Sequence, residues 1–554
     1  MTTASTDRLA VDIRHLDVTF ATDGGDVHAV RGVSLDVRPG EVLAIVGESG
    51  SGKTVTARTI LGLLPETALT QGAVVLDGID VVGLDRDALR RVRGEKAAMI
   101  FQEPSTALNP VFTVGWQLIE GLRAHGKYSK GEAKARAVDM LRRVGIPDPE
   151  RRVDDYPHQF SGGQKQRIVI AMALALNPTV IIADEPTTAL DVTVQAEILD
   201  LLRRLRDEDG TAIVLITHNM GVVADLADRV AVMLNGEVVE TAPAGELFAA
   251  PRHEYTQRLL AAVPRLEIVD RRLPESAASA APLVVADELV IEYPGRLGRP
   301  TFRAVDAVSF TISPGEVVGL VGESGSGKTT IGRAIAGLTP VSGGSLQVLG
   351  AEMLGITERR FRPRRKDLGF VFQDPATSFN PLLTIAQNVA EPLIVHGGAR
   401  NAADARPKVD ELLEAVQLPA AFGDRFPHEL SGGQRQRASL ARGLALDPKL
   451  LIADEPTSAL DVSVQARVLE LFGQLQERFG FATLFITHDL AVVDMLAHTV
   501  VVLQGGRIAE TGPTANVLGD PQNAYTRKLI ASLPVPDPAL QAERRAAWKS
   551  SHII

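Results

Sequence analysis

Residues 47–54 read GESGSGKT, and the same letters recur at residues 322–329. Each copy fits the pattern G-x-x-x-x-G-K-[ST], in which backbone N–H groups of a glycine-rich loop surround phosphate oxygens. The lysine places positive charge at the outer phosphates, and the threonine hydroxyl can bind Mg²⁺. A continuous apolar run precedes each copy, at residues 42–46 and 317–321, as expected for a strand buried on both faces. The sequence therefore predicts two phosphate-binding loops, each followed by a helix.

The loop residues expected to bind the nucleotide supply backbone donors, hydroxyls or the lysine charge. They are Gly47, Ser49, Gly50, Ser51, Gly52, Lys53 and Thr54 in the first loop, and Gly322, Ser324, Gly325, Ser326, Gly327, Lys328 and Thr329 in the second.

Four further motifs follow each loop in the same order. The first half contains FQEP with Gln102, SGGQ at 161–164, DEPTTALD at 184–191 and THN with His218. The second half contains FQDP with Gln373, SGGQ at 431–434, DEPTSALD at 454–461 and THD with His488. Chance does not keep this many motifs in register. We infer that a nucleotide-hydrolysing module has been duplicated.

Two adjacent acids end an apolar strand in each half. Open parallel sheets bind their ligands at the carboxyl ends of the strands, which is where Asp184 and Glu185 are expected to lie. Asp184 suits Mg²⁺, and Glu185 suits polarising the attacking water. Asp454 and Glu455 stand in the same places in the second half. Paired acids after an apolar run are also common on loops, so the phosphate-binding loop is what makes this interpretation specific.

The SGGQ tetrapeptide opens a strongly helical segment in both halves. Its serine is a good N-cap, and its glycines allow a ligand to approach the backbone, which predicts a second anion site. A helix cap without a ligand is the alternative for an isolated motif of this kind. The residues concerned are Ser161, Gly162, Gly163 and Gln164, and Ser431, Gly432, Gly433 and Gln434.

Three further pairs of residues are candidates for contact with the nucleotide. His218 and His488 follow apolar strands and could reach the terminal phosphate, although a single histidine at such a place is more often structural. Gln102 and Gln373 end strands and could report the nucleotide state to the segment that follows. Phe20 and Tyr293 lie upstream of each loop and could stack on adenine, or could be ordinary strand aromatics.

Composition excludes several classes of protein. The formal net charge of −10 argues against non-specific coating of nucleic acid. The sequence contains no cysteine, which excludes disulfides, thiolate metal sites and cysteine-ligated iron–sulfur clusters. No apolar run approaches the roughly 20 residues that a membrane-spanning helix needs. Any role at a membrane is therefore expected to involve a partner.

The repeat divides the chain into two α/β modules. We predict a first domain at residues 1–268, a linker at 269–283, a second domain at 284–534 and a loosely held tail at 535–554. In the first half, alternating residues from Val11 to Phe20 suggest an antiparallel strand, and residues 180–183 and 212–216 suggest buried strands. Between Gln102 and Ser161 the pattern is helical, at residues 114–124 and 130–144, which indicates an inserted helical subdomain.

With these motifs, both halves resemble the nucleotide-binding domains of ABC transporters over almost the whole chain. The resemblance implies tandem P-loop NTPase domains, each with a RecA-like core, an antiparallel β subdomain and a helical subdomain. It implies that Glu185, Glu455, His218 and His488 are catalytic and that Asp191 and Asp461 form the D-loops. It implies Mg²⁺ sites at Thr54, Gln102 and Asp184, and at Thr329, Gln373 and Asp454. It also implies head-to-tail pairing, with the Ser161 signature on the ATP held by Lys328 and the Ser431 signature on the ATP held by Lys53.

A finer resemblance is to the peptide and nickel importer branch. The stretches PSTALNPVFTVGWQL (104–118) and PATSFNPLLTIAQNV (375–389) are similar to the permease-contacting region of that branch. The stretches PRHEYTQRLLAAVP (251–264) and PQNAYTRKLIASLP (521–534) are similar to its carboxy-terminal segment. Some relatives carry a cysteine-ligated iron–sulfur cluster after this segment, which this chain cannot do because it has no cysteine.

The resemblance implies the ATP- and Mg²⁺-dependent subunit that energises import of dipeptides or oligopeptides. Its expected partners are two transmembrane permease subunits and an extracytoplasmic solute-binding protein, with the chain peripheral at the cytoplasmic face of the plasma membrane. One alternative is the same machinery with nickel, glutathione or another peptide-like cargo. A second is a soluble tandem ATPase that acts on ribosomes or nucleic acid, but such proteins usually carry a charged linker or basic arm, whereas this linker is short and alanine-rich.

Overall fold

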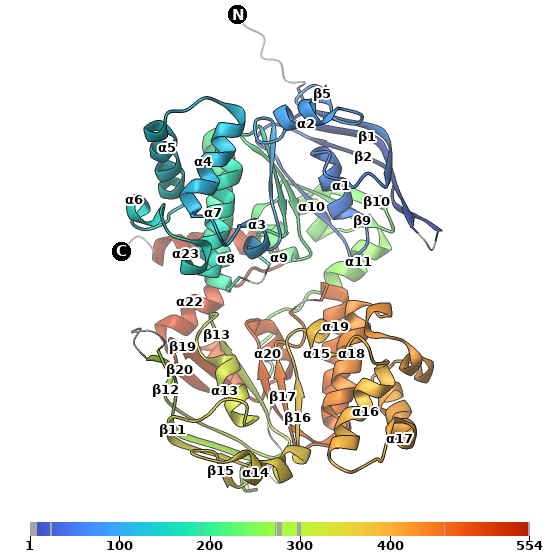
Figure 1. The fold of residues 1–554 in the computed structure, drawn as a ribbon, viewed down its shortest axis with the longest axis vertical. Helices are drawn as coiled ribbons and strands as arrows, with labels where there is room; N and C mark the ends of the chain where they lie inside the picture. The colour runs from blue at the N-terminus through green and yellow to red at the C-terminus, as the bar shows by residue number, and fades with distance from the viewer. Residues whose placement is uncertain are drawn as a thin grey trace, which may run out of the picture. The chain divides into compact units, whose positions relative to one another are not determined.

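The computed structural model describes residues 8–22, 25–188, 190–271, 273, 280–295, 301–458 and 460–551. The chain forms two compact units (Figure 1). Unit 1 comprises Met1–Val263 together with Pro534–Ile554, and unit 2 comprises Pro264–Leu533. We call residues 8–263 the first module and residues 284–533 the second module. No helix in the described part of the chain is long and apolar enough to cross a bilayer.

Unit 1 contains two sheets. The four-stranded antiparallel sheet has the order β2-β1-β4-β5, and the six-stranded sheet has the order β10-β9-β3-β8-β7-β6, in which only β10 runs antiparallel to its neighbour. The strands are β1 (Val11–Thr22), β2 (Gly25–Val37), β3 (Val42–Val46), β4 (Ala68–Leu76), β5 (Ile79–Asp80), β6 (Ala97–Ile100), β7 (Val180–Asp184), β8 (Ala212–Ile216), β9 (Arg229–Leu234) and β10 (Glu237–Pro243).

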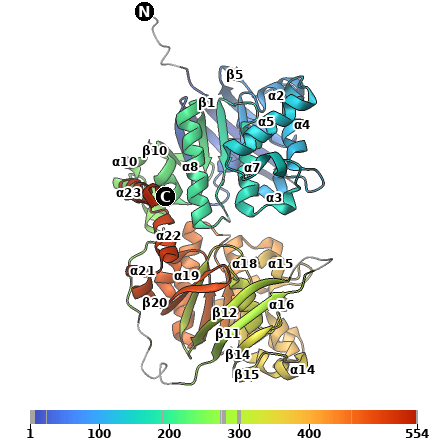
Figure 2. The ribbon, with the colours of Figure 1, turned by 90° about the vertical axis from the view of Figure 1, so that its left-hand side faces the viewer.

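The helices of unit 1 include the predicted insertion between Gln102 and the SGGQ motif. There α4 and α5 pack on each other and on α7, as Figures 1 and 2 show. The helices are α1 (Lys53–Ile60), α2 (Arg86–Val92), α3 (Pro104–Ala107), α4 (Val114–His125), α5 (Lys130–Arg143), α6 (Pro149–Arg152), α7 (Gly162–Leu174), α8 (Val192–Asp209), α9 (Met220–Leu226), α10 (Ala244–Ala249), α11 (Glu254–Ala261) and α23 (Pro538–Ser551), with a 3₁₀ turn at Pro157–Gln159.

Unit 2 repeats both sheets, with the orders β12-β11-β14-β15 and β16-β17-β18-β13-β19-β20; the antiparallel strands β11, β12 and β14 are visible in Figure 2. Its strands are β11 (Val284–Tyr293), β12 (Phe302–Ile312), β13 (Val317–Gly322), β14 (Gly343–Val348), β15 (Ala351–Glu352), β16 (Leu368–Val371), β17 (Leu450–Asp454), β18 (Ala482–Ile486), β19 (Thr499–Gln504) and β20 (Arg507–Pro513).

The helices of unit 2 follow the same order as those of unit 1. They are α13 (Lys328–Ile335), α14 (Glu358–Phe361), α15 (Pro375–Ser378), α16 (Ile385–Val395), α17 (Ala402–Ala415), α18 (Gly432–Gly443), α19 (Val462–Phe479), α20 (Leu490–Leu496), α21 (Thr514–Gly519) and α22 (Ala524–Ser532), with 3₁₀ segments at Arg362–Asp367, Ala420–Asp424 and Pro427–Glu429.

Apolar patterning explains the core strands. Every residue of β3, β7 and β8 is buried, as the continuous apolar runs predict for strands covered on both faces. In β1 the buried residues include Val11, Ile13, Leu16 and Val18. The pairing of β1 with β2 shifts register between Ile13 and Leu16, which interrupts the alternation of buried and exposed residues. The tandem α/β fold with antiparallel and helical subdomains is therefore confirmed.

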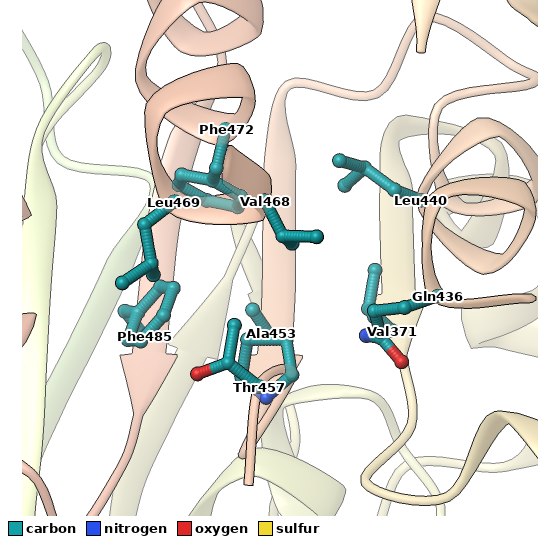
Figure 3. Close-up of a pocket in the computed structure, with 10 residues that line it drawn as sticks. Val371, Gln436, Leu440, Ala453, Thr457, Val468, Leu469, Phe472 and Phe485 are labelled. Carbon is teal, nitrogen blue, oxygen red and sulfur yellow. The ribbon is translucent and has the colours of Figure 1, made fainter. Parts of the chain in front are cut away.

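A cavity of about 10 Å³ lies in the core of unit 2, between the sheet and helices α18 and α19 (Figure 3). Figure 3 shows Leu440 of α18 opposite Val468 and Phe472 of α19. Phe472 packs edge-on against Phe485, with ring centroids 5.3 Å apart. A void of this size is at the limit for about one water molecule. It is therefore a small packing defect of the core.

The segment after the second module differs from the sequence expectation. The tail was expected to be loosely held from residue 535, but residues 538–551 form α23, which packs against α9 and α10. Asp537 caps this helix by accepting hydrogen bonds from the backbone N–H groups of Ala539 and Leu540, at 2.9 and 3.1 Å. Residues 272 and 274–279 of the predicted linker, and residues 552–554, lie outside the described residues.

Candidate active site

The first phosphate-binding loop joins β3 to α1 and holds its lysine inside the loop. The Lys53 side chain is buried, and its Nζ donates to the carbonyl oxygens of Gly47 and Glu48 at 2.7 and 2.8 Å. Gly52 has a φ of 98°, and a Cβ there would lie 2.6 Å from the carbonyl oxygen of Ala29, so only glycine fits. The second loop repeats this arrangement: Lys328 Nζ donates to the carbonyls of Gly322 and Glu323, at 2.7 and 2.9 Å.

The structure brings the loop threonine to the strand aspartate in both units. Thr54 Oγ1 donates to Asp184 Oδ1 at 3.2 Å, and Thr329 Oγ1 donates to Asp454 Oδ1 at 3.0 Å. No group of three or more His, Asp or Glu side chains is placed to hold a metal within the described ranges. The hydroxyl and carboxylate nevertheless fit Mg²⁺, because this ion takes few protein ligands and completes its shell with water and substrate phosphates.

The pKa values of the two adjacent carboxylates in each unit are shifted in opposite directions. Burial raises the pKa of Asp184, and the charge of Glu185 raises it further. For Glu185, burial raises the pKa, but the hydrogen bond and charge of His218, together with Thr188 and Lys53, outweigh it and lower the pKa overall. Glu185 is therefore ionised at neutral pH, and a cation at Asp184 would relieve the cost of its buried charge.

Glu185 lies at the centre of a hydrogen-bond network. His218 Nδ1 is 3.0 Å from Oε1, and Gln102 Nε2 donates to Oε2 at 2.7 Å. The hydroxyl of Thr188 also donates to Oε2, at 2.8 Å. Because a carboxylate only accepts, the proton of the imidazole lies on Nδ1. The φ of Glu185 is 48°, a left-handed conformation that side-chain-bearing residues rarely adopt and that clusters at functional sites.

The second unit reproduces the Gln and His contacts of this network, the His contact being looser, but Ser458, which stands where Thr188 does, donates to the backbone carbonyl of Glu455 at 3.1 Å. Gln373 Nε2 donates to Glu455 Oε2 at 3.0 Å, and His488 Nδ1 is 3.5 Å from Glu455 Oε1. Glu455 has a φ of 46°. Its pKa is raised by burial but lowered overall by His488 and Lys328, whereas burial raises the pKa of Asp454. The predicted catalytic, loop and Gln residues are thus brought together within each unit.

The signature serines cap the helices that follow them. Ser161 Oγ accepts from the backbone N–H of Gln164 at 3.3 Å, and the Gln164 side chain accepts from the N–H of Ser161 at 3.2 Å. Ser431 and Gln434 form the same capping box. The glycines differ in role: a Cβ at Gly162 would meet open space, whereas a Cβ at Gly163 would collide with Val194 of α8. Gly433 stands against Val464 in the same way.

The remaining predicted residues have these positions. Asp191 and Asp461 stand at the N-cap of α8 and α19, directly before each helix. The hydroxyl oxygen of Tyr293 is 3.4 Å from Thr330 Oγ1, which places its ring beside the second phosphate-binding loop. Phe20, at the equivalent end of β1, pairs with Val27 and packs partly on the core.

Two tyrosines near the phosphate-binding loops were missed by sequence reasoning. The buried Tyr255 of α11 accepts a hydrogen bond from the backbone N–H of Glu48, at 2.9 Å. Tyr525 of α22 accepts from the N–H of Glu323 at 3.2 Å. Both belong to the segments resembling the carboxy-terminal segment of the importer branch. The EYT and AYT repeats marked equivalent tyrosines, but nothing local indicated which backbone group they would reach.

Comparison with known families gives two matches in each half. The family model described as ABC transporter matches residues 30–188 and 305–458. The model described as the C-terminal region of oligopeptide/dipeptide transporters matches residues 239–286 and 509–552. Both Tyr255 and Tyr525 lie within the second pair of matches.

Curated relatives match over almost their full length. The chain is 45% identical to the glutathione import ATP-binding protein GsiA of Pectobacterium atrosepticum, over 96% of this chain and 91% of the relative. It is 46% identical to GsiA of Escherichia coli K12, again over 96% and 91%. The solved dimeric structure of the ATP-binding cassette MJ0796 in a post-hydrolysis state with ADP and phosphate is 33% identical, covers 42% of this chain and 98% of that chain, and has a TM-score of 0.39.

Replacing Tyr255 or Tyr525 with phenylalanine is expected to weaken ATP binding. The change removes one hydrogen bond to the loop, worth about 1 kcal/mol, which corresponds to about a fivefold rise in the KM for ATP with little change in kcat. Steady-state ATPase kinetics measure both constants. Tyr128→Phe is the matched control, since that hydroxyl contacts Arg136 on the helical subdomain. An unchanged KM in both variants would show that the tyrosines do not support the loops.

The pair His488–Glu455 is expected to make the stability of the second unit depend on pH. Burial lowers the pKa of His488, but Glu455 raises it above the ordinary 6.5 overall. When the pKa of a histidine is higher in the folded than in the unfolded state, its contribution to folding stability is fully present below the unfolded-state pKa. That contribution is lost as the pH rises through the folded-state pKa. Calorimetric melting should therefore show wild type losing stability relative to His488→Gln as the pH rises from about 6 to about 9. Parallel melting curves for the two proteins across that range would contradict the pairing.

Proposed function

Since the chain belongs to the ABC transporter family, whose ATP-binding proteins are ATPases, we propose that it energises import of dipeptides or oligopeptides. The observation that carries the proposal is that two complete sets of the ABC motifs occur on one chain that also matches the peptide-transporter C-terminal region twice. Glutathione, itself a short peptide, is the second candidate cargo, because the relatives at 45–46% identity are glutathione import ATP-binding proteins.

ATP hydrolysis needs positioning and charge stabilisation, which the residues of each unit can supply. Lys53 would exchange its loop carbonyls for the outer phosphates. Glu185, ionised and fixed by Gln102 and His218, would orient the attacking water. The proton on His218 Nδ1 faces Glu185, and the opposite ring nitrogen would face the terminal phosphate, to which it can donate only when it carries a proton of its own.

Mg²⁺, when bound with ATP, supplies positive charge that offsets charge on the phosphates. Thr54 and Asp184 would hold it in the first site, and Thr329 and Asp454 in the second. Gln102 and Gln373 use their amide nitrogens on the catalytic glutamates, so their amide oxygens are the atoms that could complete the set.

The signature helices support head-to-tail pairing of the two modules around ATP. In each unit the N-terminus of the signature helix is exposed at Ser161 or Ser431, and a helix N-terminus attracts anions. Ser161 would then bind the ATP held by Lys328, and Ser431 the ATP held by Lys53, with Asp191 and Asp461 beside them.

The helical subdomains are proposed to contact two permease subunits at the cytoplasmic face of the membrane, with an extracytoplasmic binding protein delivering cargo. The first carries an exposed aromatic pair, Phe112 and Trp116, stacked with centroids 3.9 Å apart. The second carries Leu382, a residue that is 83% exposed. Exposed apolar groups of this kind mark interaction surfaces. One surface is aromatic and the other aliphatic, so we propose that each contacts a different permease surface.

The variants Glu185→Gln and Glu455→Gln are each expected to reduce turnover sharply. Removing the water-orienting carboxylate should cost about 100-fold or more at the altered site. ATPase assays on the purified chain, with ATP binding measured separately, test this. Glu246→Gln, an exposed carboxylate on α10, is the control. Wild-type hydrolysis by either active-site variant, with ATP still bound at the altered site, would show that the two sites are not equivalent.

Purification of the chain from native membranes in mild detergent is expected to bring down two multi-span permeases and a lipid-anchored binding protein. The binding protein can then be screened against dipeptides, oligopeptides and glutathione to identify the cargo. Trp116→Glu together with Leu382→Glu should release the permeases, because a charge would be buried without a partner. Copurifying ribosomes, or a chain that stays soluble and alone while hydrolysing ATP, would contradict the importer function.

A further inference from the structure

The segment that follows each module belongs to the other unit. Residues 264–271 follow the first module in the chain and form part of unit 2, while Pro534 and α23 follow the second module and form part of unit 1. Each copy of the peptide-transporter C-terminal region, at residues 239–286 and 509–552, therefore begins in one unit and ends in the other. We call the two exchanged segments, residues 264–271 and residues 534–551, the straps.

The first strap is anchored on α20, the helix that begins two residues after His488. Asp494 is 1% exposed, and its carboxylate accepts hydrogen bonds from three successive backbone N–H groups. They belong to Glu267, Ile268 and Val269, at 2.8, 2.8 and 3.1 Å. Successive N–H groups converging in this way form an anion-binding nest.

The nest requires an unusual backbone at Ile268. Its φ is 56°, in the left-handed region, which a β-branched residue adopts only where the surroundings enforce it, at a cost of about 1–3 kcal/mol. Asp494 offsets that cost with three charge-assisted hydrogen bonds. Without this contact, Ile268 would favour an extended conformation. The strap is therefore fixed on α20 by specific hydrogen bonds.

The second strap is anchored on α9, the helix that begins two residues after His218. At the first turn, a Cβ at Gly221 would lie 2.6 Å from the carbonyl oxygen of Pro534, so the strap runs directly against the helix backbone. At the last turn, Arg545 donates to both the carbonyl oxygen and the Oδ1 of Asp225, at 3.1 Å each. The same carboxylate also accepts from Arg203 of α8, at 2.9 Å.

The straps therefore act on the helices that directly follow His218 and His488. Asn219 caps α9 by accepting from the N–H groups of Gly221 and Val222, and so ties His218 to the first turn of the helix. Asp489 does the same for α20. A shift of α9 or α20 would move the histidine away from its catalytic glutamate, since the helix and its capping residue move together.

We propose that Arg545 and Asp494 are positioning residues for hydrolysis: each holds the helix that follows His218 or His488 in one module through the strap that follows the other module. The inference rests on the proposed catalytic role of His218 and His488. Each module would thus depend for its full rate on a segment that continues from its counterpart.

The test uses the full-length chain with Arg545→Ala and, separately, Asp494→Asn. Each is expected to lower kcat by about tenfold with an unchanged KM for ATP, because displacing a catalytic group by about 1 Å can cost roughly 100-fold. Arg545→Lys should restore most of the rate, since the contact to Asp225 needs one cationic donor. Glu543→Ala, an exposed change on the same helix, is the matched control and should behave as wild type.

Hydrogen–deuterium exchange assigns each effect to its helix. Arg545→Ala should increase exchange at residues 220–226 and leave residues 490–496 unchanged, and Asp494→Asn should do the reverse. Wild-type kcat in both variants, or a rate loss that parallels a loss of folded protein in thermal melting, would overturn the positioning role. His218→Ala separates the two proposals. If this variant retains full ATPase activity, the catalytic role of the histidine is wrong. If it loses activity while Arg545→Ala and Asp494→Asn keep the wild-type rate, only the inference about the straps is wrong.

Discussion

The site depends on the carboxyl edge of the parallel sheet, where the hydrogen bond from Thr54 to Asp184 forms. This bond joins residues 130 positions apart at 3.2 Å because β3 and β7 are parallel strands of one sheet, with β8 between them, and end at the same edge. The loop lysine follows β3, Glu185 follows β7 and His218 follows β8. One constraint, parallel strands buried on both faces, therefore brings the proposed catalytic groups together.

Much of this was predictable because it is encoded locally. The apolar runs at 42–46, 180–183 and 212–216 gave strands β3, β7 and β8, and the periodic segments at 114–124 and 130–144 gave α4 and α5. Motif residues at strand ends had to converge once the strands were parallel. Thr54 with Asp184, and Glu185 with His218 and Gln102, are contacts that follow from this rule.

Contacts between segments far apart in the chain carried no local signal. Tyr255 lies in a short amphipathic helix, and the sequence does not show that its hydroxyl meets a backbone amide 207 residues earlier. The tail was expected to be loosely held, yet Arg545 reaches Asp225 across 320 residues. Gly163 was interpreted as giving access to a ligand, but it is also required where α7 meets Val194 of α8. Such roles depend on which surfaces meet in three dimensions.

The aromatic surface at Phe112 and Trp116 and the aliphatic surface at Leu382 are encoded on a single polypeptide. Translation therefore delivers them in a fixed one-to-one ratio, whatever the level of expression. For the pairing of modules proposed above, a covalent tether would also keep the second module at a local concentration of about the millimolar range, which two separate chains would lack. A single chain thus fixes the ratio of the two surfaces and, under the proposed pairing, disfavours the pairing of two like modules.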